Sequence, residues 1–242
     1  SRRQRQMCIR DRKKYANSQG IEIIGDIPIY MGYDSVDVWA GQKEFQLDEN
    51  LTPVKVAGVP PDAFSDKGQK WGNPLYDWEY HKKTGYKWWI DRLRFSASIY
   101  DIVRIDHFRG FESYYAVPYG DETAENGEWR KGPGAELFKA AEKALGKLNI
   151  IAEDLGFITE DVYKMLADVG YPGMKILQFA FGEDSTNEHL PHNFTSSNCI
   201  AYTGTHDNET LKGWVSSQSS DTLKYCMAYL GVKKKKDIPK NI

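Results

Sequence analysis

The alternation of short apolar runs with helical patterns is the feature that most constrains the fold of this chain. We expect strands at residues 21–28, 101–106, 149–152, 173–181 and 199–202. The first should end at Pro28 and run into a loop, because proline cannot donate to a sheet ladder. Helical patterns cover residues 78–98, 135–145, about 160–170 and the segment from 209 to about 230. Parallel neighbouring strands need long crossover connections, which are usually helices. The sequence therefore predicts an α/β fold with a parallel sheet.

Acidic residues stand at the C-terminal ends of three expected strands, at Asp106, Glu153 and Asp207. Alternate residues of a strand share a face, so Arg104 and Asp106 point to the same side. Taken alone, that pattern also fits an exposed edge strand with a salt bridge. A doubly wound sheet would also carry its site at strand ends, but the sequence has neither Gly-x-Gly-x-x-Gly nor a P-loop. We therefore expect a (β/α)8 TIM barrel, whose active site lies at the C-terminal ends of its strands.

Two regions lack these patterns. Residues 1–14 (SRRQRQMCIRDRKK) are basic and have no apolar periodicity. They are expected to be a non-native or disordered leader, although a basic nucleic-acid-binding arm is an alternative. Residues 32–77 are rich in Gly, Pro and Asp and are expected to form a long irregular insertion after the first strand, of the kind that is normally functional. Residues 15–242 are then a partial catalytic barrel that includes this insertion.

Composition limits the partners and the compartment. The chain has 32 Lys and Arg against 34 Asp and Glu, a net charge of −2, which gives no electrostatic reason to expect nucleic acid or an anionic membrane. Its 3 cysteines are odd in number and have no metal-ligand spacing, which favours a reducing compartment. No apolar run approaches the length of a membrane-spanning helix. We expect a cytoplasmic protein without membrane contact.

Three carboxylates at one barrel mouth suit either a metal site or glycosyl transfer. His107 and His206 leave the metal site open as an alternative. Retaining glycosyl transfer needs a nucleophilic carboxylate and a protonated partner about 5–5.5 Å away. Arg104 would keep Asp106 ionised by charge pairing, as a nucleophile requires. The 7 Trp and 15 Tyr are weak evidence for a carbohydrate ligand, because sugar-binding clefts use flat aromatic faces.

At this point the chain resembles a known family, the 4-α-glucanotransferases of glycoside hydrolase family 77 within the α-amylase superfamily. The Ile-Pro-Ile-Tyr and Trp-Gly-Asn-Pro pieces separate this family from ordinary amylases. The matching stretches run in the family's order from residue 21 to about 215: GDIPIY (25–30), DSVDVW (34–39), VAGVPPD (56–62), GQKWGNPLY (68–76), RIDHFRG (104–110), AEDLG (152–156) and GTHDN (204–208).

The resemblance implies the roles of the site residues and the substrates. Asp106 would be the nucleophile that forms a β-glucosyl-enzyme, and Glu153 the general acid and base. Asp207 would bind ring hydroxyls and stabilise the distorted sugar. The substrates would be maltooligosaccharides and other α-1,4-glucans, with glucose or a glucan as acceptor and no cofactor or metal. The other substrate-binding residues would be Arg104, His107, His206, Trp71, Asn73, Asp62 and Tyr30.

The chain is shorter than the family pattern requires. Its five expected strands correspond to the third through seventh of eight, so the barrel is incomplete and cannot close. We therefore expect a fragment that is inactive in isolation. Two other functions stay open: a glucan hydrolase of the same superfamily, and an inactive glucan-binding fragment.

Overall fold

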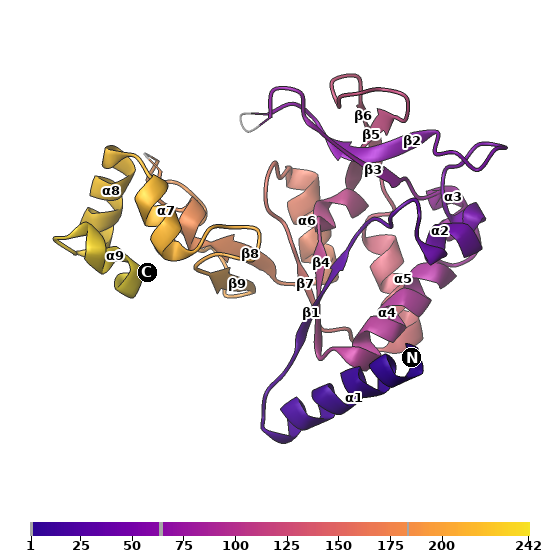
Figure 1. Cartoon of the computed structure of the whole chain (residues 1–242), viewed down its shortest axis with the longest axis horizontal. Coiled ribbons are helices and arrows are strands. Elements are labelled where there is room, and N and C mark those ends of the chain that lie inside the picture. The colour runs from indigo at the N-terminus through magenta and orange to yellow at the C-terminus, as the bar shows by residue number, and fades with distance from the viewer. Residues whose placement is uncertain (1, 63–64, 183) are drawn as a thin grey trace. The chain divides into compact units, whose positions relative to one another are not determined.

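A computed structural model describes residues 2–62, 65–182 and 184–242 of the chain (Figure 1). The chain divides into two compact units, Ser1–Tyr171 and Pro172–Ile242. Each has its own core of buried apolar side chains, and we describe each by itself. Among the described helices, none is both long and apolar enough to cross a membrane.

The first unit is built on a three-stranded parallel sheet in the order β1-β4-β7. The strands are β1 (Ile24–Pro28), β4 (Ile102–Asp106) and β7 (Ile150–Ala152). Asp26 lies opposite Arg104 in the register, and Pro28 lies opposite Asp106. Pro28 ends β1 as expected, because proline has no N–H to donate to a sheet ladder. The predicted α/β fold with a parallel sheet is confirmed.

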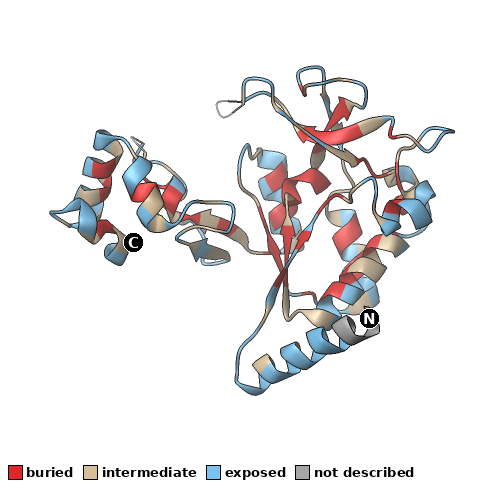
Figure 2. Ribbon diagram, in the orientation of Figure 1, coloured by how far each residue is buried: buried red, intermediate tan, exposed pale blue. Residues whose placement is uncertain are grey.

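Helices α3 (Trp78–Lys83), α4 (Lys87–Ile99), α5 (Ala135–Leu145) and α6 (Glu160–Val169) belong to this unit. Their buried faces and those of the strands meet in one core, which appears as the red interior of Figure 2. The single helix expected over residues 78–98 is in fact two helices. Tyr86 has φ 58° and ψ 27°, a left-handed conformation that a continuous right-handed helix cannot contain.

The predicted irregular insertion is wrong, because residues 32–77 contain regular structure. They hold α2 (Val36–Ala40), β2 (Lys55–Val59) and β3 (Gln69–Pro74). Together with β5 (Ser113–Pro118) and β6 (Glu128–Lys131), the strands form an antiparallel sheet in the order β3-β2-β5-β6. Ala57 pairs with Ala116, so the partner of β2 lies far along the chain and leaves no local pattern to read.

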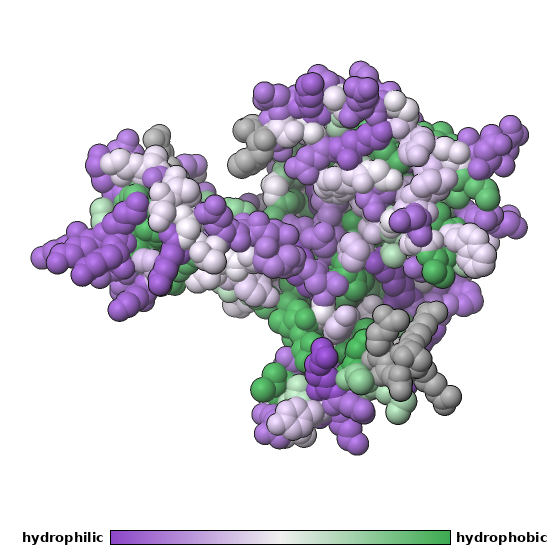
Figure 3. Space-filling view, in the orientation of Figure 1, coloured by the Kyte–Doolittle hydropathy of each residue, from purple (hydrophilic) through white to green (hydrophobic). Residues whose placement is uncertain are grey.

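Both faces of this antiparallel sheet are buried along β2 and β5. Val56, Tyr115, Val117 and Ala124 form a small buried cluster. Hydrophilic residues cover most of the surface above β2 and β3 in Figure 3. On the opposite face, Ala57, Tyr114 and Ala116 belong to the main core of the unit.

The N-terminal segment also differs from expectation, because Arg2–Ser18 form helix α1. Its Arg, Gln and Lys residues favour a helix without supplying an apolar stripe. The Lys13 ammonium donates to the carbonyl of Tyr100 at 2.7 Å and lies 3.3 Å from the Asp101 carboxylate. The backbone of residues 2–14 is thus helical, which differs from the expected disorder. That this segment is a non-native leader stays a prediction.

The second unit contains a parallel strand pair, β8 (Gly173–Ile176) and β9 (Cys199–Tyr202). The strand expected over residues 173–181 ends early, in a 3-10 helix at Leu177–Phe179. Helices α7 (Leu211–Ser217), α8 (Ser220–Leu230) and α9 (Ile238–Asn241) follow. Their core includes Phe181, Trp214, Leu223, Cys226 and Ile238.

Candidate active site

Arg104 joins two carboxylates at the C-terminal edge of the parallel sheet. Its Nη1 lies 2.5 Å from Asp26 Oδ2 on β1, and its Nη2 lies 3.1 Å from Asp106 Oδ1 on its own strand. The register that sets Asp26 opposite Arg104 makes the first contact, and the two-residue period of the strand makes the second. Burial opposes the positive charge, but the hydrogen bond to Asp26 and the charges of Asp26 and Asp106 outweigh it, so the pKa of Arg104 is raised.

Glu153 follows β7 and is only 8 % exposed. Its Oε2 accepts a hydrogen bond from the backbone N–H of His107 at 2.7 Å, and its Oε1 accepts one from the N–H of Leu155 at 2.8 Å. Burial and the nearby Asp106 carboxylate raise the pKa of Glu153 to about 7, against the opposite effect of the two backbone donors and Arg104. A carboxyl group that holds its proton near neutral pH is suited to general acid catalysis.

His107 turns the chain between these two carboxylates. Its backbone is left-handed, with φ 53° and ψ 47°, which is uncommon for a residue other than glycine. Its ring packs edge-on against Trp71, with centroids 4.9 Å apart. Burial, and to a lesser extent the charge of Arg109, lower the pKa of His107 to about 3. The ring is therefore neutral at pH 7 and offers one donor and one acceptor.

A cavity of about 480 Å³ opens beside His107. Three of the predicted substrate-binding residues line it, namely Asp62, Trp71 and His107. Tyr30 is buried behind them, with its ring centroid 6.2 Å from that of Trp71. Asn73 holds the loop instead, because its Nδ2 donates to the carbonyl of Met31 at 3.0 Å.

Asp207 and His206 belong to the second unit, in the loop that follows β9. His206 Nε2 lies 3.4 Å from Asp207 Oδ1, and both side chains are exposed. The Asn208 side chain shapes this loop by accepting a hydrogen bond from the N–H of Thr205 at 2.8 Å. Both residues thus follow the C-terminal end of a parallel strand, as the sequence predicts. Their meeting with Asp106 and Glu153 stays a prediction.

Two further residues of the first unit bear on the site, and sequence reasoning did not select them. Asp26 forms the ion pair with Arg104 from the middle of β1, and the sequence pattern, which set it near the end of the strand, did not show that it faces Arg104. Arg109 lines the cavity, together with Trp129 and Phe157. It stands in the same motif as Asp106, but the sequence does not tell where a loop arginine points.

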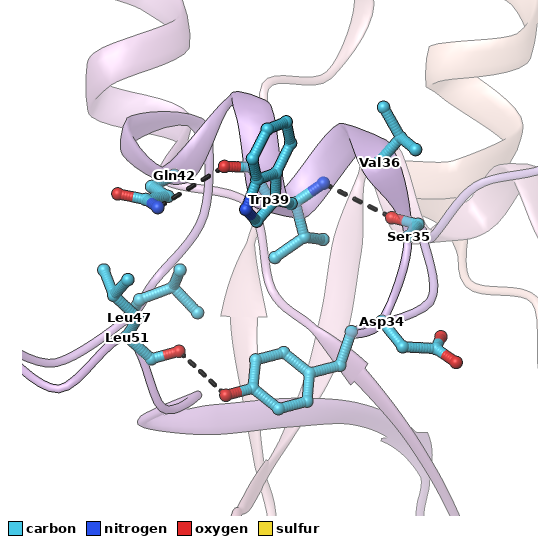
Figure 4. Close-up of a pocket in the computed structure, with 9 residues that line it drawn as sticks. Asp34, Ser35, Val36, Trp39, Gln42, Leu47 and Leu51 are labelled. Carbon is cyan, nitrogen blue, oxygen red and sulfur yellow. Dashed lines mark hydrogen bonds between the residues drawn. The ribbon is translucent and has the colours of Figure 1, made fainter.

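Among the described residues, no group of three or more His, Cys, Asp or Glu side chains is arranged to hold a metal ion. A second cavity, of about 450 Å³, lies beside α2 and contains none of the predicted site residues (Figure 4). Trp39, which is 78 % exposed, lines it with Tyr33, whose hydroxyl donates to the carbonyl of Leu51 at 3.0 Å. The first cavity, in contrast, is lined by Asp62, Trp71 and His107, and it is therefore the candidate substrate site.

An ion-paired aspartate, a buried glutamate with a raised pKa and an aromatic-lined cavity at the end of a parallel sheet are typical of enzymes that act on glycosidic bonds. Comparison with known proteins is more specific. The model of glycoside hydrolase family 77, described as 4-alpha-glucanotransferase, matches residues 4–242. The chain belongs to this family.

Relatives of known function support the assignment. The chain is 57 % identical over 203 residues to a 4-alpha-glucanotransferase of Clostridium butyricum, covering 84 % of this chain and 42 % of that protein. It is 55 % identical over 216 residues to one of Streptococcus pneumoniae, covering 89 % of this chain and 43 % of that protein.

A solved structure is also similar. The structure of amylomaltase from Streptococcus agalactiae in complex with acarbose has a TM-score of 0.88 and 46 % identity, over 91 % of this chain and 45 % of that chain. The chain thus spans less than half the length of the relatives it matches.

Proposed function

We propose that this chain is part of a retaining 4-α-glucanotransferase, which moves segments of α-1,4-glucans to an acceptor glucan or to glucose. The observation that carries the proposal is a buried Glu153, with its pKa raised to about 7, near an arginine-bound Asp106 at one sheet edge. Maltooligosaccharides are the expected donors, which agrees with the acarbose bound in the related amylomaltase. We place the enzyme in the cytoplasm, where its free cysteines Cys8, Cys199 and Cys226 would stay reduced.

Asp106 attacks the anomeric carbon of the donor sugar, and a covalent β-glucosyl-enzyme forms while the glycosidic bond breaks. Glu153 gives its proton to the departing oxygen. It then takes a proton from the acceptor hydroxyl, which attacks the same carbon from the opposite side and releases Asp106.

Asp207 binds ring hydroxyls of the distorted sugar, and His206 donates to sugar hydroxyls. The neutral ring of His107 and the indole of Trp71 hold the sugar in the cavity beside Asp62. Tyr30 and Asn73 support this wall from behind.

Transfer requires that a sugar hydroxyl reacts with the intermediate before water does. An aromatic-lined cavity favours a sugar over water, and Trp71 and Trp129 both line this one. Hydrolysis by the same residues is the second candidate. The relatives are 4-alpha-glucanotransferases, which favours transfer.

The architecture that we propose is a (β/α)8 barrel of which this chain supplies the third through seventh strands. β1, β4 and β7 would be three consecutive strands, and β8 and β9 the next two. In that arrangement Asp106 ends β4, Glu153 and Asp207 follow β7 and β9, and the three acids meet at one mouth. The remaining strands would come from parts of a longer protein, which agrees with the length of the relatives.

Maltotriose tests the reaction in the complete protein that contains this chain. Transfer yields both glucose and oligomers longer than maltotriose, whereas hydrolysis yields only shorter products. Asp106→Asn and Glu153→Gln should each abolish the longer products while leaving acarbose binding measurable by calorimetry. Asp168→Asn, an exposed acid on α6, is the control and should keep full activity. Shortening of maltotriose without longer oligomers would replace transfer by hydrolysis.

A further inference from the structure

Arg109 is a buried cation with three partners in three segments of the first unit. Its Nη1 donates to the carbonyl of Phe157 at 2.8 Å, and its Nη2 donates to Ser113 Oγ at 2.7 Å. Its guanidinium carbon lies 4.1 Å from the centre of the Trp129 ring. The side chain is only 4 % exposed. Such a planar fork fixes two acceptors and one aromatic face at once, which a flexible ammonium cannot do.

These partners connect the antiparallel sheet with the loop that carries Glu153. Ser113 begins β5 and Trp129 lies in β6, while Phe157 lies four residues after Glu153. Arg109, Trp129 and Phe157 also line the same cavity as His107 and Trp71. Arg109 therefore connects the antiparallel sheet and the loop after Glu153, which both line the cavity.

The loop needs an anchor at this point. Gly156, between Leu155 and Phe157, has φ 90°, a conformation that glycine reaches easily and leaves easily. The N–H of Leu155 donates to Glu153 Oε1 at 2.8 Å, so this loop supplies one of the two backbone donors to that carboxylate. When the Phe157 carbonyl is held in place, the loop is limited to conformations in which the Leu155 N–H points to Glu153 Oε1.

We propose that Arg109 is a positioning residue for Glu153, which acts by holding the carbonyl of Phe157 and thereby the N–H of Leu155. It does not touch the carboxylate itself. The inference deepens the proposed function, on which the role of Glu153 as the acid rests.

Loss of the Arg109 hydrogen bond to Phe157 should change the pKa of Glu153. Glu153 faces Asp106 and Arg104 on β4, and it accepts hydrogen bonds from the N–H groups of His107 and Leu155. Of these, Asp106 raises the pKa and the other three lower it. When the Leu155 N–H moves away, the pKa of Glu153 should rise further above its value of about 7.

The test uses Arg109→Lys and Arg109→Gln in the complete protein. The carboxyl pKa of Glu153 is measured by carbon-13 NMR, with Glu153→Gln to assign the signal, and kcat is measured against pH. We expect the pKa and the alkaline limb of kcat to rise by about half a pH unit or more in both variants. We also expect kcat to fall about tenfold, with a smaller change in KM. Because lysine keeps the charge, a rise in Arg109→Lys separates positioning from charge.

Arg92→Lys is the matched control. Arg92 also bonds backbone carbonyls, those of Pro28 and Ile29, and lies 4.8 Å from the Trp89 ring, but it does not contact the Glu153 loop. It should lower Tm without moving the pKa of Glu153. The inference is overturned if Arg109→Lys leaves that pKa unchanged, or if Arg92→Lys shifts it equally. A shifted pKa in a protein that shows no glucan transfer would sustain the positioning role and reject the proposed function.

Discussion

Arg104 bonds Asp26 and Asp106 with one planar group, and this geometry gives the first prediction. Arg104→Lys keeps the charge but cannot reach both carboxylates in the same way. Loss of one charge-assisted hydrogen bond, worth about 1.5–3 kcal/mol, should lower kcat by about 10- to 100-fold. Initial rates of maltotriose conversion in the complete protein measure this.

Arg94→Lys is the control for that substitution, because Arg94 pairs with Asp91 on the exposed side of α4. It should keep full activity. An Arg104→Lys enzyme as fast as the parent would show that the ion pair does not prepare Asp106 for attack.

Glu153 gives a prediction that does not depend on activity. Its pKa in the folded chain is about 7, raised mainly by burial from an ordinary value of 4.5. The folded state therefore binds more protons than the unfolded state between these values, and stability falls as pH rises through that window. Glu153→Gln removes this loss. We expect Glu153→Gln to stabilise the protein more at pH 8 than at pH 5, and Tm measured at the two pH values checks this. The difference in the free energy of unfolding should be up to about 3 kcal/mol.

Equal effects of Glu153→Gln at both pH values would contradict the raised pKa. Asp168→Asn serves again as the control, because Asp168 is an exposed acid.

The protonation of Glu153 also sets the pH dependence of catalysis. Transfer by the parent enzyme should fall as pH rises above about 7, because the general acid must carry its proton.

The positions of some of these residues could be predicted from the sequence, and the positions of others could not. The positions of Arg104 and Asp106 on one face follow from the period of a strand, so they could be predicted. The contact of Glu153 with the N–H of His107 could not, because it depends on a left-handed backbone at a residue with a side chain. The partners of Arg109 lie in three separate segments, and no local pattern brings these segments together.

At the scale of elements, the antiparallel sheet is held by a close approach of backbone to backbone. A Cβ atom on Gly58 would lie 2.3 Å from the carbonyl oxygen of Gln69 on β3. Gly58→Ala should therefore disrupt the pairing of β2 with β3 and destabilise the protein by about 2 kcal/mol. A fall in Tm measures this, with Gly120→Ala as control, because a Cβ there meets no heavy atom within 4 Å. Equal Tm values for the two variants would contradict the close pairing.

Elements with a local signature were predicted well, and those that depend on distant pairing were missed. The apolar face of α5 gives its bounds, Ala135–Leu145, as expected. The strand β2 is short, contains Gly58 and pairs with residues 115–118, so its sequence resembles a loop. This sheet carries Trp71 and Trp129 to the cavity, so the missed element bears directly on the site.

At the scale of the whole molecule, the proposed barrel gives the last prediction. Strands three to seven of a barrel leave both edges of the sheet unpaired, and such edges are prone to aggregation. The 242-residue chain alone should therefore show no disproportionation of maltotriose, although it contains Asp106, Glu153 and Asp207. The complete protein, at the length of the relatives, should produce both glucose and longer oligomers under the same conditions. Chromatography of the products from equal amounts of the two proteins measures the difference. Longer oligomers made by the isolated chain would show that five strands are enough to assemble the site, and the requirement for a closed barrel would then be abandoned.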